Sequence, residues 1–209
     1  MSSATEATGD RHNAAAVSPL NLPNAITVSR LAIALVLFAL IDIEGWWRTA
    51  AALFVFAAST DFLDGYFARR WGQVTQLGRI LDPFVDKIIV CGSFLFLVRH
   101  PESGVCGWTA FVVFAREMLV TQIRSTLEAR GVDFSAAWIG KMKMALQCVA
   151  VTVCLLSLSP EFVAALPVSE TAAFAVRDLI VWAMVALTVW SGIDYCIRAA
   201  RLLSRKSQP

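Results

Sequence analysis

The chain has 209 residues, of which 57% are hydrophobic and 16% are charged, and its formal net charge is +2. Soluble domains carry about 25% charged residues, so this composition excludes an ordinary soluble domain. It predicts one integral membrane domain instead, with the lipid bilayer as a partner and no nucleic acid. The net charge says little, whereas the placement of the charges is informative.

The first residues differ in composition from the rest of the chain. Residues 1–18 are polar and rich in alanine and serine, which predicts a disordered tail. This tail contains Glu6 and Asp10 and has no apolar core, so it resembles neither a signal peptide nor a transit peptide. We expect the membrane domain to occupy residues 19–203 and a short basic tail to follow at 204–209.

Six apolar runs divide the predicted membrane domain. They cover residues 25–43, 47–68, 79–98, 107–128, 139–158 and 173–200. Each run is close to the roughly 20 residues that a helix needs to cross the hydrocarbon core of a bilayer. Because lipid cannot satisfy an open strand edge, the runs predict an all-α protein with six transmembrane helices.

Basic residues are unequally divided between the two sides of these runs. One side carries Arg69, Arg70, Arg79, Arg130, Lys141, Lys143, Arg198, Arg201, Arg205 and Lys206. The other side carries Arg48, Arg99 and Arg177. Because basic loops stay in the cytoplasm, we expect both termini to be cytoplasmic, in a multi-pass protein of the cell (inner) membrane.

Four aspartates interrupt the second and third apolar segments. Asp61 and Asp64 are three residues apart, and Asp82 and Asp86 are four apart, so each pair lies on one face of its helix. Two facing helices would direct all four carboxylates toward one point near the cytoplasmic side. A carboxylate at the bilayer centre costs roughly 2.5–3.5 kcal/mol, so this cluster requires compensating cations, water or protein partners.

Three interpretations of the aspartates follow from the residues alone. Carboxylate oxygens favour hard divalent ions such as Mg²⁺ or Mn²⁺, and four acids suit a two-metal site for displacement at phosphorus. The second interpretation is an ion-paired cluster, in which Arg69, Arg79 and Lys87 neutralise the acids. The third interpretation is a divalent-cation transporter, which would use the same carboxylates to bind its cargo.

The fixed residues around the aspartates resemble the signature of the CDP-alcohol phosphotransferase family. The chain matches the pattern D-x-x-D-G-x-x-A-R-x8-G-x3-D-x3-D between residues 61 and 86 at every fixed position. The resemblance implies a fold of six transmembrane helices, two divalent ions at a cytoplasmic active site and a homodimer. A transporter would not need the glycine, alanine and arginine positions of this pattern, so the resemblance favours the enzyme.

Further segments are similar to the family members that use glycerol 3-phosphate. These segments are residues 21–30, 81–87, 115–117 and 138–143. The resemblance implies transfer of the phosphatidyl group of CDP-diacylglycerol to sn-glycerol 3-phosphate, with release of CMP. Sister enzymes with phosphatidylglycerol, inositol phosphate or serine as acceptor remain alternatives, because acceptor specificity depends on few positions.

The same resemblance assigns roles to the residues near the signature. Asp61, Asp64 and Asp82 are expected to hold metal ions, and Asp86 both to hold metal and to accept the proton of the acceptor hydroxyl. Six positions are expected to bind CDP-diacylglycerol: Asn24, Thr27, Gly65, Ala68, Arg69 and Gly78. Capping of the first helix is an alternative role for the asparagine and the threonine. Nearby Arg30 has snorkelling to the membrane interface as its alternative role.

Four basic residues form a candidate site for the acceptor phosphate. Arg116 and Arg124 are eight residues apart, about 80° around a helix, so both can border one cavity. Lys141 and Lys143 are about 200° apart, so we expect one of them to face that cavity, although both also suit anchoring on the cytoplasmic side. Glu117 is seven residues before Arg124 and is expected to orient it.

Overall fold

The computed structural model describes the backbone of residues 22–71, 76–129 and 138–205. Side chains are described for residues 28–60, 84–129, 142–202 and Ser204. The predicted polar tail of residues 1–18 lies outside this part of the protein, as does most of the predicted basic tail.

Six long helices make up most of the described chain: α1 (Leu22–Asp42), α2 (Trp47–Trp71), α3 (Gln76–Leu97), α4 (Gly107–Ala129), α5 (Trp138–Ser157) and α7 (Glu170–Arg205). Two short helices, η1 (Pro101–Ser103) and α6 (Pro160–Ala164), lie in the connections. Among the described residues there is no strand, which confirms the all-α prediction. Each of the six apolar runs falls on one long helix.

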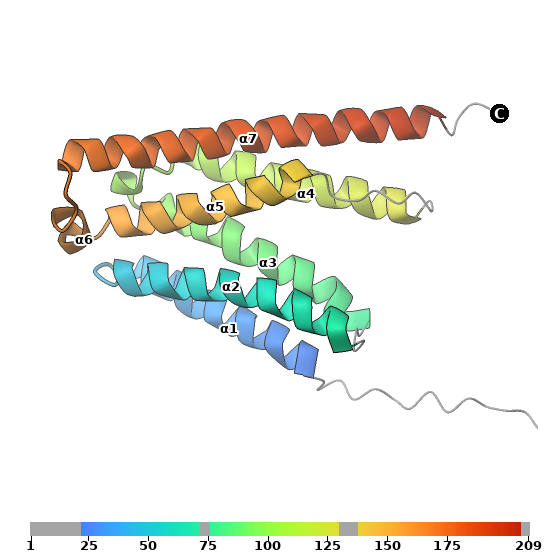
Figure 1. Ribbon diagram of the computed structural model, residues 1–209, viewed down its shortest axis with the longest axis horizontal. Helices are drawn as coiled ribbons and strands as arrows, with labels where there is room; N and C mark the ends of the chain where they lie inside the picture. Colours follow the sequence, from blue (N-terminus) through green and yellow to red (C-terminus); the bar gives the residue numbers. More distant parts are fainter. Residues whose placement is uncertain (1–21, 72–75, 130–137, 206–209) are drawn as a thin grey trace, which may run out of the picture.

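The six long helices alternate in direction (Figure 1). The start of α1 and the end of α7 lie at the same end of the bundle, at the right of the view. The adjoining ends of α2 and α3, and those of α4 and α5, lie at this end as well. The short helix α6 and the connection between α1 and α2 lie at the opposite end. Residues near the helix ends therefore fall into two groups, one at each end of the bundle.

Apolar packing holds the helices together in two connected groups. Helix α1 packs on α2 and α3, α7 packs on α4 and α5, and contacts of α2 with α5 and of α3 with α4 and α5 join the groups. The core includes Leu37, Phe54, Phe94, Val151 and Met184, one from each of five long helices, and all five are fully buried. This arrangement lets polar side chains of α4, α5 and α7 meet inside an otherwise apolar bundle.

One glycine allows α1 and α3 to approach closely. A Cβ atom added to Gly92 would overlap the ring of Phe38, which in turn stacks on Phe96 with ring centroids 5.0 Å apart. A larger residue at position 92 would therefore separate the two helices. The close approach matters for the site because α1 carries Arg30 and α3 carries Asp86.

Among the described residues, one helical stretch is long and apolar enough to cross a membrane by itself. This stretch is Glu170–Leu202 in α7, and its apolar part has a mean hydropathy of 1.8. The apolar stretch of α5, Met142–Ser157, is shorter than the roughly 20 residues required. The six-span prediction therefore remains a prediction at this point.

Candidate active site

The four aspartates of the signature lie on α2 and α3, which are consecutive and run in opposite directions (Figure 1). Asp61 lies ten residues before Trp71, where α2 ends, and Asp86 lies ten residues after Gln76, where α3 begins. Asp64 and Asp82 are seven and six residues from the same helix ends. With a rise of about 1.5 Å per residue, each aspartate of α2 thus has a counterpart on α3 at a similar depth.

Asp86 has a described side chain, whereas those of Asp61, Asp64 and Asp82 lie outside the described residues. Within the described side chains, no three His, Cys, Asp or Glu residues come together. The metal site therefore stays a prediction. Its donor set consists of carboxylate oxygens, which fits a hard divalent ion rather than zinc or copper.

Asp86 is paired with an arginine from α1. Nη2 of Arg30 lies 3.5 Å from Oδ1 of Asp86, and the two side chains are 4% and 26% exposed. The arginine is therefore directed into the bundle rather than toward the membrane interface. Its positive charge compensates the carboxylate, which still keeps some access to solvent or substrate.

The positions expected to bind CDP-diacylglycerol all lie near helix ends at one end of the bundle. Asn24 and Thr27 lie in the first two turns of α1, and Gly78 lies in the first turn of α3. Gly65, Ala68 and Arg69 lie in the last two turns of α2. The side chains of these six residues lie outside the described residues, so their roles stay predictions.

A second charged cluster joins α4 to α5. The carboxylate of Glu117 accepts a hydrogen bond from Nζ of Lys143, and its Oε1 lies 3.4 Å from Nη1 of Arg116. Lys143 is 4% exposed and Arg116 is 9% exposed. Burying a charge costs several kcal/mol unless it is well paired, so these two cations are stable here partly because they share one carboxylate.

Helix α7 supplies the other partners of the two arginines. Nε of Arg116 donates to Oγ of Ser191 at 3.0 Å, and Nη2 of Arg124 donates to the hydroxyl of Tyr195 at 2.9 Å. The guanidinium of Arg116 also lies over the ring of Tyr195, 5.9 Å from its centroid. The sequence interpretation missed Ser191 and Tyr195. Their spacing of four residues, inside an apolar run, was the available signal for a polar helix face.

One detail of the acceptor prediction differs in the structure. Glu117 was expected to orient Arg124, but its carboxylate pairs with Lys143 and lies beside Arg116, whereas Arg124 is held by Tyr195. The spacing of two residues on one helix predicts only that they share a face. The partners of Glu117 and Arg124 instead come from α5 and α7. Lys143 faces the cluster, and the side chain of Lys141 lies outside the described residues.

Some donors in this region have no protein partner. Nε of Arg124 and Nε2 of Gln147 are buried, and neither makes a hydrogen bond within the described part of the chain. Gln147 is 1% exposed and follows Lys143 by one turn of α5. A buried donor without a partner loses free energy, so both atoms suit a bound acceptor group.

Lys87 connects the two charged regions. It interacts electrostatically with Asp86 on its own helix and with Glu117 and Arg124 on α4. Among the described side chains of this region, five cations therefore accompany two carboxylates: Arg30, Lys87, Arg116, Arg124 and Lys143, with Asp86 and Glu117. Cations inside an apolar bundle form strong charge-assisted hydrogen bonds, so those of α4 and α5 are suited to bind a phosphate group.

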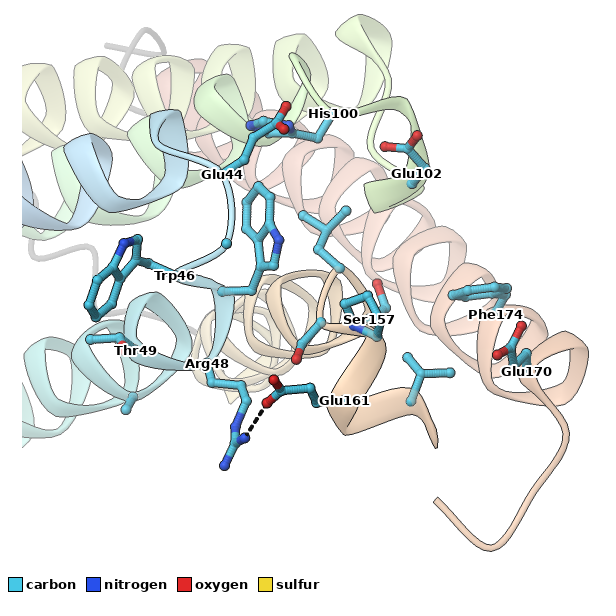
Figure 2. Close-up of a pocket in the computed structure, with 17 residues that line it drawn as sticks. Glu44, Trp46, Arg48, Thr49, His100, Glu102, Ser157, Glu161, Glu170 and Phe174 are labelled. Atoms are coloured by element: carbon cyan, nitrogen blue, oxygen red, sulfur yellow. Dashed lines mark hydrogen bonds and ion pairs between the residues drawn. The ribbon is translucent and has the colours of Figure 1, made fainter. Parts of the chain in front are cut away.

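A wide pocket lies at the opposite end of the bundle, with a volume of about 1430 Å³ (Figure 2). Glu44, Glu102 and Glu170 line it, and Arg48 pairs there with Glu161 at 2.9 Å. None of the predicted site residues lines this pocket. Its open, mainly acidic wall does not suit a phosphorylated substrate, so the candidate active site is the region around Asp86 and Arg124.

Comparison with known proteins identifies the family of this chain. The sequence matches the family model of CDP-alcohol phosphatidyltransferase over residues 20–190. A Bacillus subtilis (strain 168) protein named CDP-diacylglycerol–glycerol-3-phosphate 3-phosphatidyltransferase is 34% identical over 190 residues, which cover 84% of this chain and 93% of the relative. A Rickettsia typhi protein of the same name is 30% identical, over 84% of this chain and 94% of the relative. An Arabidopsis thaliana protein with this name and the number 2 is 30% identical, over 94% and 90%.

Proposed function

Because this chain belongs to the CDP-alcohol phosphatidyltransferase family, we propose that it transfers the phosphatidyl group of CDP-diacylglycerol to sn-glycerol 3-phosphate. The products are phosphatidylglycerophosphate and CMP. The names of its relatives support both substrates. The observation in the structure that carries the choice of acceptor is the group of buried cations around Glu117.

The cation cluster fits the phosphate of a small acceptor. Arg116 and Lys143 are nearly fully buried, and Nε of Arg124 is buried without a hydrogen-bond partner among the described residues. A phosphate monoester would bring oxygens that accept hydrogen bonds from those donors. An uncharged acceptor such as free glycerol would satisfy these donors less well, which disfavours it. Lys141 is the fourth proposed phosphate-binding residue, from the cytoplasmic start of α5.

Divalent metal ions are the proposed cofactors, as is general in this family. Asp61, Asp64, Asp82 and Asp86 would hold two ions, Mg²⁺ or Mn²⁺, because their positions on α2 and α3 pair at similar depths. When bound, the ions neutralise the diphosphate and polarise the phosphorus that is attacked.

The other predicted residues would bind the nucleotide end of the lipid substrate. Asn24, Thr27, Gly65, Ala68, Arg69 and Gly78 form this group. Their places at one end of the bundle support the proposal (Figure 1), because a water-soluble cytidine group must remain at the membrane surface while the acyl chains stay in lipid.

The reaction replaces one phosphorus–oxygen bond by another. Arg116, Arg124 and Lys143 bind the phosphate of glycerol 3-phosphate and orient one of its two free hydroxyls toward the phosphatidyl phosphorus. The hydroxyl oxygen forms the new bond as its proton passes to Asp86, and the bond to CMP breaks. A free carboxylate is a weak base for an alcohol, so the proton transfer accompanies the attack rather than preceding it.

The proposed setting is the cell (inner) membrane, with residues 19–203 as one domain of six spans and both termini in the cytoplasm. Large apolar side chains on the outside of the bundle support this setting. They include Leu35 on α1, Phe56 on α2, Leu95 on α3, Phe111 on α4, Val149 on α5 and Trp182 on α7, all exposed. The start of α1 and the end of α7 lie at the same end of the bundle, which supports a topology with both termini on one side of the membrane (Figure 1). Following the family resemblance, we also propose a homodimer.

The proposal is tested with the purified full-length protein in detergent micelles that contain CDP-diacylglycerol. CMP release is measured with glycerol 3-phosphate, phosphatidylglycerol, inositol phosphate, serine and free glycerol as acceptors. We expect the highest kcat/KM with glycerol 3-phosphate. A higher value with another acceptor would replace the proposed substrate within the same family.

The transporter interpretation is tested separately. The protein is reconstituted in liposomes, and uptake of Mn²⁺ is followed with an enclosed dye. We expect no protein-dependent uptake. If the protein took up Mn²⁺ and released no CMP with any of the acceptors, the proposed function would be refuted.

A further inference from the structure

Helix α7 carries one side chain that contacts both arginines of the acceptor site. We propose that Tyr195 is a positioning residue, which holds Arg124 and Arg116 at the separation that suits the phosphate of the acceptor. The inference rests on the proposed function, because it concerns the same acceptor site. It assigns to α7 a role that the signature on α2 and α3 does not cover.

The contacts of Tyr195 involve different parts of its side chain. Its hydroxyl accepts a hydrogen bond from Nη2 of Arg124 at 2.9 Å, whereas the face of its ring lies 5.9 Å from Cζ of Arg116. Tyr195 itself is 3% exposed and packs in an apolar cluster with Val120 and Leu127 of α4. A side chain held so firmly can define the positions of the groups that it touches.

The neighbouring turn of α7 fixes the second arginine from another direction. Oγ of Ser191 accepts from Nε of Arg116 at 3.0 Å. A Cβ atom on Gly192 would lie 3.3 Å from Cγ of Arg116, so the glycine lets the arginine lie close against α7. Ser191 and Tyr195 are one turn apart and therefore present a continuous surface to the two arginines.

This support is required because α4 alone would not bring the arginines together. Arg116 and Arg124 are eight residues apart, which is about 12 Å along the helix axis. Their long side chains have many rotamers, and each rotamer that is fixed before binding reduces the entropy lost when the phosphate binds. Tyr195 contacts Nη2 of Arg124, and Nε of this arginine has no hydrogen-bond partner within the described part of the chain, so it is a candidate donor to the ligand.

The test is Tyr195→Phe in the full-length enzyme, which removes the hydroxyl and keeps the ring. Because the hydroxyl acts on the phosphate only through Arg124, its loss should raise the KM for glycerol 3-phosphate less than the loss of Arg124 itself, by about three- to tenfold. The kcat and the KM for CDP-diacylglycerol should change less than twofold or so. The inhibition constant of inorganic sulfate, which competes for the phosphate site, should rise in parallel with the acceptor KM.

Thr188→Val is the matched control. It also removes a buried hydroxyl from α7, one turn before Ser191, but the hydroxyl of Thr188 contacts Met184 rather than an arginine. We expect wild-type kinetic constants for this variant. An equal rise in the acceptor KM in both variants would mean that any hydroxyl deletion in α7 disturbs the bundle, and it would overturn the inference.

A double-mutant cycle separates positioning through Arg124 from other effects. In the Arg124→Ala background, Tyr195→Phe should have no further effect on the acceptor KM. Additive effects, or an unchanged acceptor KM in Tyr195→Phe alone, would overturn the inference. The proposed function would remain intact as long as the enzyme releases CMP with glycerol 3-phosphate. Absence of CMP release from the wild-type enzyme with glycerol 3-phosphate would refute the proposed function itself.

Discussion

Nη2 of Arg30 on α1 lies 3.5 Å from Oδ1 of Asp86 on α3, and this ion pair joins two helices inside the bundle. The arginine is 4% exposed, so it has given up most of its hydration to reach the carboxylate. The last aspartate of the signature therefore has a compensating charge from a helix outside the signature. This relationship makes Arg30 a part of the site as well as of the fold.

Arg30→Ala should destabilise the protein, because it leaves the carboxylate of Asp86 without this partner. We expect a loss of roughly 1–3 kcal/mol in the free energy of unfolding, together with a lower kcat. The double variant Arg30→Ala/Asp86→Asn should be more stable than Arg30→Ala alone, since the uncompensated charge is then absent. Denaturation midpoints in detergent measure this difference. Equal midpoints for the single and double variants would show that the pair does not contribute to stability.

The metal proposal predicts that Asp61→Asn, Asp64→Asn and Asp82→Asn each abolish CMP release. Asparagine keeps the size of aspartate but removes the charge that holds a hard divalent ion. Treatment with EDTA should also inactivate the wild-type enzyme, and added Mg²⁺ or Mn²⁺ should restore it. Asp42→Asn is the control, because Asp42 is exposed at the other end of the bundle, where it pairs with Arg99. Full activity of the metal-free enzyme would contradict the two-metal site.

The long helices were predictable because their apolar runs are separated by clear polar breaks. The predicted run at 173–200 underestimated α7, which extends over Glu170–Arg205 because its polar final turns continue the helix beyond the apolar part. The short helix α6 was missed, although Ser159 precedes Pro160 in a pattern typical of a helix start. Oγ of Ser159 does accept from the backbone N–H of Phe162, at 3.4 Å.

The composition of the acceptor cluster was predictable only in part. The sequence places Arg116 on one helix with Arg124, and the structure shows that Arg116 is buried. The partners of Arg116 and Arg124 depend on the register between α4 and α7, which no spacing within one helix determines. Tyr195 and Ser191 could therefore be assigned only after the two helices were placed side by side.

The acceptor proposal predicts that Arg124→Ala raises the KM for glycerol 3-phosphate by about 10- to 100-fold, as expected for the loss of one charge-assisted contact to phosphate. The KM for CDP-diacylglycerol should remain nearly unchanged, because the arginine is assigned to the acceptor alone. Arg198→Ala is the control, since Arg198 lies on the same end of the bundle but pairs with Asp194 at 2.8 Å and is half exposed. An unchanged acceptor KM in Arg124→Ala would place the phosphate elsewhere.

Asp86 is assigned to the chemical step, so its substitution should have the opposite kinetic signature. Asp86→Asn should lower kcat by about 10²- to 10⁴-fold, the range typical of a lost general base, with little change in the acceptor KM. Steady-state CMP release over a range of glycerol 3-phosphate concentrations measures both constants. A variant with normal kcat and a raised acceptor KM would instead make Asp86 a binding residue.

The proposed topology can be tested through Cys106, which is exposed just before α4 at the end of the bundle opposite the termini. The pKa of its thiol is lowered from the ordinary value by the hydroxyl of Thr109, whose Oγ1 lies 3.4 Å from Sγ. A lower pKa means a larger thiolate fraction at neutral pH, and the thiolate is the form that reacts with a maleimide. A membrane-impermeant maleimide should therefore label the enzyme rapidly in intact right-side-out vesicles. Thr109→Val should raise the pKa of the Cys106 thiol again. It should therefore slow labelling at pH values below that pKa, where less thiolate is present.

The control for Cys106 uses a thiol at the other end of the bundle. In the Cys106→Ser background, labelling of intact vesicles should be lost, and Ser204→Cys should react only after the membrane is permeabilised. Ser204 is suitable because it is exposed in the last turn of α7, which the proposed topology places in the cytoplasm. If Ser204→Cys were labelled in intact vesicles and Cys106 were not, the orientation would be the reverse of the proposed one. The active site would then face away from the cytoplasm, where glycerol 3-phosphate is expected to be available.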